Sequence, residues 1–335
     1  MTIRTEDCAR DLSAKVDLHE QRASLYLYVG QLSVEEEALE KYQKGIEDLE
    51  TAIDVCQKIA TRIQDEGTDD METDETVEEP IQKLRQQLCK AHCTVADLYL
   101  TDLCFAENAE QQCEMHARKA MEIEGENGKP LLDALQTLAS LRLSQSRGLE
   151  AIDHILAAYD TMKVGCEALA TLVGLGDSDP DLNGNAIELM EVEAANNLPE
   201  FEFRCQTAKL LLESASVLNE SSEDEDGKRE DHCIQCAIQV LGSLMAENDE
   251  VVEIWYLLGC AFSSVHPPQD EAARQYLSQA KDMLSKVKEE LELEYKHDSE
   301  NEEIHCQLED IEAQLGNIET KLASLGGGGM HEEDD

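Results

Sequence analysis

The chain has 335 residues, of which 74 are acidic and 27 basic, and its formal net charge at pH 7 is -47. Aromatic residues make up only 4% of the chain, and this composition favours helix over sheet. A field this negative repels nucleic acids and anionic membranes and attracts basic partners. We therefore expect neither direct DNA or RNA binding nor membrane binding.

The sequence shows no membrane span and no secretory signal. No apolar run approaches the ~20 residues that a membrane span needs, and the opening MTIRTEDCARDL has no apolar core. We therefore expect an intracellular protein whose cysteines are mostly reduced thiols. No Lys/Arg cluster suitable for nuclear import is visible, because Lys228–Arg229 stands alone among acidic residues.

The first predicted helix pair follows a polar segment, residues 1–18. From His19 to Ala52 the sequence fits a helix–turn–helix repeat whose turn is Gly30–Val34. Its packing positions are Leu25, Val29, Ala38, Tyr42 and Gly45. The acidic run 65–79 has no apolar period, so it is predicted to be a disordered loop inserted between helices.

Two further helix pairs are predicted in the middle of the chain. Pro80 suits the first turn of a helix, which we expect to run from Ile81 to Phe105. The repeat pattern then recurs over Thr94–Asn127 and Leu132–Gly165. Residues 174–185, GLGDSDPDLNGN, read as a loop.

The most specific repeat signal is ENDEVVEIWYLLGCAF, Glu247–Phe262, which holds the only tryptophan. It matches the W-x2-L-G-x2-Y/F opening of a tetratricopeptide repeat. The matching positions are Trp255, Leu258, Gly259 and Phe262 on the first helix and Ala272, Tyr276 and Ala280 on the second. We expect Gly259 and Ala272 to let the two backbones approach closely.

The last third of the chain reads as more helices around a second acidic insertion. Helices are predicted at Pro199–Leu218 and Cys233–Met245, with the acidic insertion 220–231 between them. Glu302–Leu325 reads as a terminal capping helix with an inward apolar stripe. The acidic, Gly-rich tail 326–335 is expected to be flexible.

These elements predict an all-α fold. Residues 19–325 are expected to form a superhelical solenoid of tetratricopeptide-type helix pairs, ending in the capping helix. Neighbouring pairs must stack, because no pair can bury its apolar face alone.

One cysteine motif could carry chemistry. Cys233-Ile-Gln-Cys236 follows His232 and could be a redox motif or half of a zinc site, with Cys89, His92 and Cys93 as the nearest second ligand group. We favour the reading in which these cysteines pack in helices as small apolar residues. Because the sequence has no phosphate loop, nucleophile elbow or H-E-x-x-H motif, we expect no enzyme, no cofactor and no metal.

The concave face of such a solenoid is lined by the first helix of each pair. Projecting the predicted registers places nine partner-binding candidates there: Glu20, Gln31, Asp102, Phe105, Asp133, Gln136, Ser140, Glu253 and Tyr256. Tetratricopeptide domains that hold chaperone C-terminal carboxylates place Lys, Arg and Asn at these positions. Because the residues here are acidic, neutral or aromatic, the face suits a basic peptide. Each residue taken singly fits a solvated surface position equally well.

Several stretches together carry a family resemblance. They are Leu198–Phe201, Arg204, Lys209–Glu213, Val240–Leu241, Leu244, Glu247 and Val251–Gly259, supported by Leu135–Arg147 and by SLYLYVGQ with EALEKYQKGIEDL. Over about residues 19–325 the chain resembles the fungal tetratricopeptide assembly chaperones of universal large-subunit ribosomal protein four.

The resemblance implies a function. It implies that the chain captures the newly made ribosomal protein, holds its long basic internal loop and protects it. The chain would then escort this client from cytoplasm to nucleus, as a monomer bound 1:1. The missing import signal fits a client that supplies one, and it fits equally a chain that lacks an N-terminal extension. The acidic composition fits such a client independently of the resemblance. An adaptor or scavenger for other basic clients, such as histones, remains the alternative.

Overall fold

The computed structural model describes the backbone of residues 2–65, 71–125, 132–175, 193–221, 227–297 and 301–326. Within these ranges every regular element is an α-helix and none is a strand, which confirms the all-α prediction. The chain divides into two compact units, Met1–Gln145 and Ser146–Asp335. None of the helices in the described ranges is both long and apolar enough to cross a membrane.

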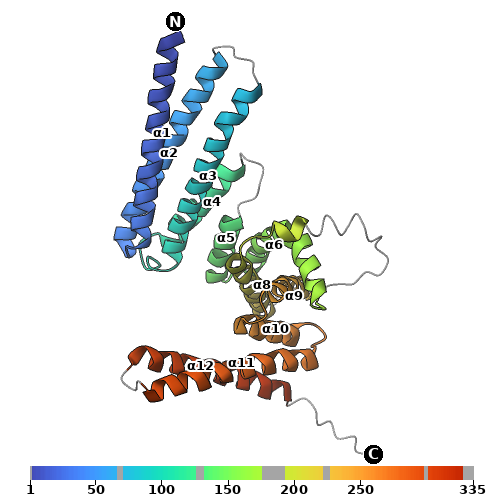
Figure 1. The fold of residues 1–335 in the computed structure, drawn as a ribbon. Helices are drawn as coiled ribbons and strands as arrows, with labels where there is room; N and C mark the ends of the chain where they lie inside the picture. Colours follow the sequence, from blue (N-terminus) through green and yellow to red (C-terminus); the bar gives the residue numbers. More distant parts are fainter. Residues whose placement is uncertain are drawn as a thin grey trace, which may run out of the picture. The chain divides into compact units, whose positions relative to one another are not determined.

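The first unit is a series of helices that fold back on one another (Figure 1). They are α1 (Thr2–Gln31), α2 (Glu35–Asp65), α3 (Met71–Leu100), α4 (Ala109–Gly125) and α5 (Leu132–Ser144). α1 packs on α2 and α2 on α3, while α4 and α5 pack on α3 and on each other. Helices adjacent in the chain are therefore neighbours in space, as the repeat prediction requires.

The α1–α2 pair is held together by close backbone approach. Ala38, Tyr42 and Gly45 on α2 are buried, as predicted. A Cβ on Gly45 would lie 2.7 Å from Leu27 Cδ2, and a Cβ on Gly30 would lie 3.1 Å from the Tyr42 ring. Each glycine therefore leaves space for a side chain of the other helix: Gly45 for Leu27, and Gly30 for Tyr42.

The predicted packing face of α1 is wrong. Val16, Ala23 and Gly30, seven residues apart, are the buried positions, whereas Leu25 and Val29 are exposed. Moving two positions along a helix turns the side chain by about 200° around the axis. The register was misassigned because α1 carries apolar residues on opposite faces, and periodicity alone does not say which face is buried.

Two predictions near the acidic run 65–79 are wrong. α3 begins at Met71, so the predicted loop 65–79 is helical over much of its length. Residues 2–18, for which the sequence predicted no secondary structure, belong to α1. Pro80 lies inside α3 rather than at its first turn. Glutamate is a strong helix former, so acidic stretches without an apolar period can still be helical. Residues 66–70 lie outside the described residues.

A buried histidine pair joins α3 to α4. His92 Nδ1 and His116 Nδ1 are 2.8 Å apart, and Tyr99 stacks on His116. Burial lowers the pKa of His92 to about 4, with smaller contributions from the charges of His116 and Lys119, and burial likewise lowers the pKa of His116 to about 4. One ring donates and the other accepts, an arrangement that is lost when both are protonated.

The histidine pair predicts an acid-sensitive first unit. Between about pH 6.5 and pH 4 the two histidines are protonated in the unfolded chain but remain neutral in the folded protein. The free energy of unfolding should therefore fall as the pH is lowered through this window, on the order of 3 kcal/mol per histidine. The free energy of unfolding of wild type and of H92Q/H116Q, measured by urea denaturation from pH 7 to 4.5, checks this. The double variant should show a shallower decline, whereas H305Q, at an exposed histidine, should follow wild type.

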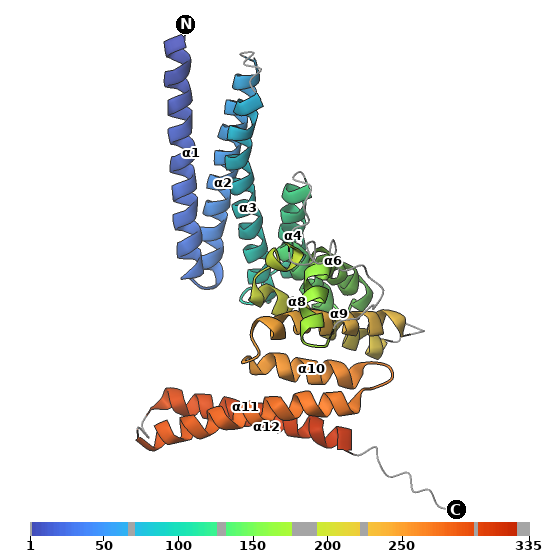
Figure 2. The ribbon, with the colours of Figure 1, turned by 45° about the vertical axis from the view of Figure 1, so that its right-hand side comes forward.

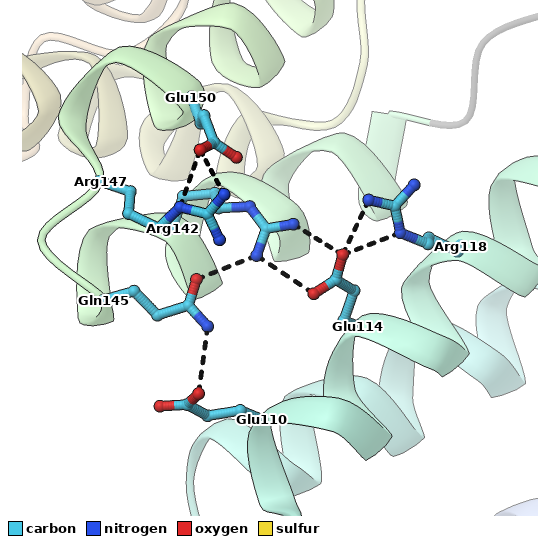
Figure 3. A network of polar contacts seen from close by, with 7 residues as sticks. All are labelled: Glu110, Glu114, Arg118, Arg142, Gln145, Arg147 and Glu150. Carbon is cyan, nitrogen blue, oxygen red and sulfur yellow. Dashed lines mark hydrogen bonds and ion pairs between the residues drawn. The ribbon is translucent and has the colours of Figure 1, made fainter.

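A second polar group ties α5 to α4 (Figure 3). Arg142, which is buried, donates from Nη2 to Glu114 Oε1 at 2.8 Å and from Nη1 to Gln145 Oε1 at 2.9 Å. Hydrogen bonds from Arg142 and Arg118 hold the pKa of Glu114 at about 2. Since a buried cation left without its partner costs about 3–5 kcal/mol, Glu114 fixes the position of α5 against α4.

The second unit is also built from consecutive packed helices (Figure 1). They are α6 (Gly148–Leu172), α8 (Phe201–Ser221), α9 (Lys228–Glu247), α10 (Val252–Ser264), α11 (Asp270–His297) and α12 (Glu302–Gly326). α6 packs on α8 and α9, and from α8 onward each helix packs on the next. α8 and α9 reach into the predicted insertion 220–231, of which residues 222–226 lie outside the described residues.

The tryptophan-containing repeat forms a tight helix pair, α10 and α11. A Cβ on Gly259 would lie 2.5 Å from Leu277 Cγ, so this glycine is the point of closest approach. The predicted small residue Ala272 is only partly buried, whereas its neighbour Ala273 is fully buried. Tyr276 completes the contact, with its ring centroid 5.6 Å from that of Trp255 and 5.3 Å from that of Phe262.

The capping helix is confirmed as α12. Its inward stripe includes Ile311 and Ile318, both buried against α11, with Leu315 and Leu322 partly buried beside them. Lys281–Glu319 and Lys288–Glu312 ion pairs, each 2.8 Å, link the two helices along their length. Of the predicted tail, residues 327–335 lie outside the described residues.

Candidate partner-binding surface

A polar surface is formed where α5 lies against α3 in the first unit. Thr137 Oγ1 is 3.0 Å from Asp97 Oδ1 and 3.0 Å from the Asp133 carbonyl oxygen. Asp133, Gln136, Thr137 and Ser140 share one face of α5 because they are spaced by three or four residues. We call Asp97 with Asp133, Gln136 and Ser140 the α3/α5 surface.

The carboxylate of Asp97 has an unusual environment. Asp97 is open to solvent on one side, yet the surrounding protein desolvates its carboxyl and raises its pKa to about 6. The Thr137 hydrogen bond lowers this pKa, and the negative charge of Asp133 raises it. Asp97 is thus mostly ionised at pH 7, next to another acid. A cation from a partner would stabilise the ionised Asp97 carboxylate, because it would offset both the desolvation of that carboxylate and its repulsion by Asp133.

The other predicted residues of the first unit are dispersed. Glu20 on α1 accepts a hydrogen bond from Lys83 Nζ on α3 at 2.8 Å, so its charge is already paired. Gln31 is exposed at the end of α1. Asp102 and Phe105 were assigned to a helix, but α3 ends at Leu100 and both lie in the turn that follows it. Phe105 is 99% exposed there.

The two predicted residues of the second unit are engaged in its own packing. Glu253 forms a 2.8 Å ion pair with Lys209, and its Oε2 lies 3.6 Å from Cys205 Sγ. Tyr256 packs on the core cluster that contains Leu277, and burial raises its pKa to about 12. The Glu253 charge is therefore already paired, and the Tyr256 ring is partly covered by its own unit.

The structure therefore brings together only one subset of the predicted site, Asp133, Gln136 and Ser140 on α5. It adds Asp97, which the sequence analysis missed. The only signal was an acidic residue flanked by the apolar positions Ala96 and Leu98, a signal too weak to interpret without the α3–α5 contact.

The cysteine motif sits in the core of the second unit. Cys233 and Cys236 are buried on α9, and burial raises the pKa of the Cys236 thiol to about 12. A thiol held protonated in this way is a poor nucleophile and a poor metal ligand. Across the described residues, no group of three or more His, Cys, Asp or Glu side chains is placed to hold a metal ion.

Comparison with known proteins finds similarity to a curated protein and to a solved structure. No protein-family model matches the sequence. A Schizosaccharomyces pombe (strain 972 / ATCC 24843) protein named "Probable assembly chaperone of rpl4" is 28% identical over 242 residues, which are 72% of this chain and 52% of that protein. The chain thus spans about half the length of this relative.

The solved structure carries a related title. "Assembly Chaperone of RpL4 (Acl4) (Residues 1-338)" aligns over 70% of this chain and 65% of its own, with 24% identity and a TM-score of 0.47. The chain is similar in sequence to a protein named as a probable assembly chaperone of rpl4, in agreement with the resemblance seen in its own residues.

Proposed function

We propose that this chain is an assembly chaperone that binds a newly made rpl4-type ribosomal protein. The observation that carries the proposal is the 28% identity over 242 residues to a protein named as a probable chaperone of rpl4. A net charge of -47 supports it independently, because a ribosomal protein is a strongly basic client.

The proposed mechanism is electrostatic capture followed by pairing. The negative field of the whole chain steers a basic segment toward the protein, and this steering weakens as salt increases. Asp97 and Asp133 on the α3/α5 surface then pair with Lys or Arg of the client's long internal loop. Desolvated carboxylates form stronger charge-assisted hydrogen bonds than carboxylates in open solvent.

We propose that the chain acts by binding and catalyses no reaction, since the proteins that it resembles are named as chaperones. We also propose that it moves between cytoplasm and nucleus with its client. Imaging of the fluorescently tagged chain, with and without client expression, tests this. Nuclear signal that does not depend on the client would contradict transport by the client's own import signal.

The binding experiment uses purified chain and purified rpl4-type ribosomal protein in isothermal titration calorimetry at about 0.15 M salt. We expect a 1:1 complex that is lost when the internal loop is deleted and that core histones do not displace. Loop-independent binding would overturn the mechanism. Displacement by histones at similar concentration would favour a general adaptor for basic clients over a dedicated chaperone.

A further inference from the structure

α1 carries two apolar seams on opposite faces. The first, Val16, Ala23 and Gly30, packs on α2. The second consists of leucines two positions further along, at the same seven-residue spacing: Leu18 and Leu25 on α1, continued by Leu32 in the turn that follows the helix. Two positions correspond to about 200° around a helix, so this second seam points almost directly away from α2.

The second seam is exposed along its whole length. Leu18 is 53%, Leu25 65% and Leu32 71% exposed, and the exposed Tyr28 and Val29 lie beside them. Figure 2 shows α1 against α2, with no other helix of the first unit on its far side. We call Leu18, Leu25, Tyr28, Val29 and Leu32 the outer seam. A contiguous exposed apolar patch on a soluble protein marks an interaction site.

The spacing of the outer seam indicates the shape of its occupant. Apolar residues repeating every seven positions along a helix interlock with a second helix, whose side chains fill the holes between them. An extended peptide or a loop would not match this period. The occupant is therefore another amphipathic helix, in the mode by which a helix lays its apolar face on a partner.

The negative charge near the outer seam then indicates which kind of helix binds there. Glu35, Glu36 and Glu37 are exposed in the first turn of α2, directly after Leu32 and Val34 at the end of the seam. A second copy of this chain would bring the same carboxylates and another net charge of -47, so self-association is opposed by repulsion. We propose that the outer seam binds an amphipathic helix of a partner protein whose apolar heptads are flanked by Lys and Arg.

Two designed peptides test the assignment. Each has three heptads with leucine at the seam positions; one carries Lys and the other Glu at the flanking positions. Fluorescence anisotropy at about 0.15 M salt should show the Lys peptide binding at least about tenfold more tightly than the Glu peptide. Equal affinity for both would overturn the charge assignment. The peptides contain no ribosomal sequence, so this result is independent of the proposed client.

Matched variants locate the binding. L25S/L32S should weaken the Lys peptide by about tenfold or more, while V287S/L293S, at exposed apolar residues of α11 in the second unit, should bind like wild type. Y28S alone should weaken binding in the same direction. Wild-type affinity in L25S/L32S would overturn the proposal.

Analytical ultracentrifugation of the chain alone tests whether the outer seam binds a second copy of the chain. We expect a monomer at micromolar concentration. A dimer that L25S/L32S abolishes would assign the outer seam to a second copy and overturn the partner assignment.

Discussion

A D97K/D133K variant is expected to bind the basic client about a hundredfold more weakly than the wild type. Thr137 donates a hydrogen bond to the Asp97 carboxylate, the surrounding protein desolvates that carboxylate, and the negative charge of Asp133 on α5 acts against it. Replacing them with lysines removes two pairing partners and adds two repulsive charges at the same place. Calorimetry at about 0.15 M salt measures the affinity, and far-UV circular dichroism checks that the helices remain.

E47K/E50K is the matched control. It changes the net charge by the same amount, but at exposed positions on α2. Its loss of affinity should be small and should disappear at high salt, since it acts only through the long-range field. D97N/D133N should fall between the two, because it removes the charges without reversing them. Equal losses in D97K/D133K and E47K/E50K would show that the client responds only to net charge and that the α3/α5 surface is not its site.

A Gly259→Ala change is expected to destabilise the α10–α11 pair by about 2 kcal/mol. The new methyl would lie 2.5 Å from Leu277 Cγ and 3.2 Å from the Leu277 backbone nitrogen, so two packed helices must separate. This strain outweighs the gain of about 1 kcal/mol in helix propensity. Urea denaturation followed by the fluorescence of Trp255, the only tryptophan, measures the loss from within α10.

Two comparisons make this prediction specific. Gly316→Ala on α12 places a methyl where nothing lies within 4 Å, so it should stabilise by about 1 kcal/mol. In a Leu277→Ala background, which removes the side-chain clash and leaves only the 3.2 Å contact with the backbone nitrogen, Gly259→Ala should cost much less. If Gly259→Ala costs as much without Leu277 as with it, the glycine is not needed for the approach of α11.

Secondary structure and pairing could be predicted where one apolar period dominates. The W-x2-L-G pattern located α10, and the seven-residue stripe through Ile311 and Ile318 located α12, because each has a single apolar face. The same reasoning placed Tyr42 and Gly45 correctly on α2. The family resemblance, which rests in part on the segments around Trp255 and Tyr42, agrees with the curated relative.

The candidate site could be predicted only in part. Asp133, Gln136 and Ser140 share a face because the α5 register was right. Asp102 and Phe105 left the predicted face because α3 ends at Leu100, and helix ends depend on local contacts that periodicity does not report. Glu20 and Glu253 lie on helices as expected. Their ion pairs with Lys83 and Lys209 could not be predicted, because they depend on which helix packs alongside.

The amino-acid sequence was sufficient for the all-α class, for the strongly acidic field and for the helix pairs that have one apolar stripe, because these follow from composition and local spacing. Only the tertiary structure decided which seam of α1 is buried, that Leu277 packs against Gly259, and that Asp97 on α3 accepts a hydrogen bond from Thr137 on α5. Each of these depends on contacts between helices distant in sequence or on a choice between equivalent faces. Local periodicity leaves such choices open, and packing resolves them.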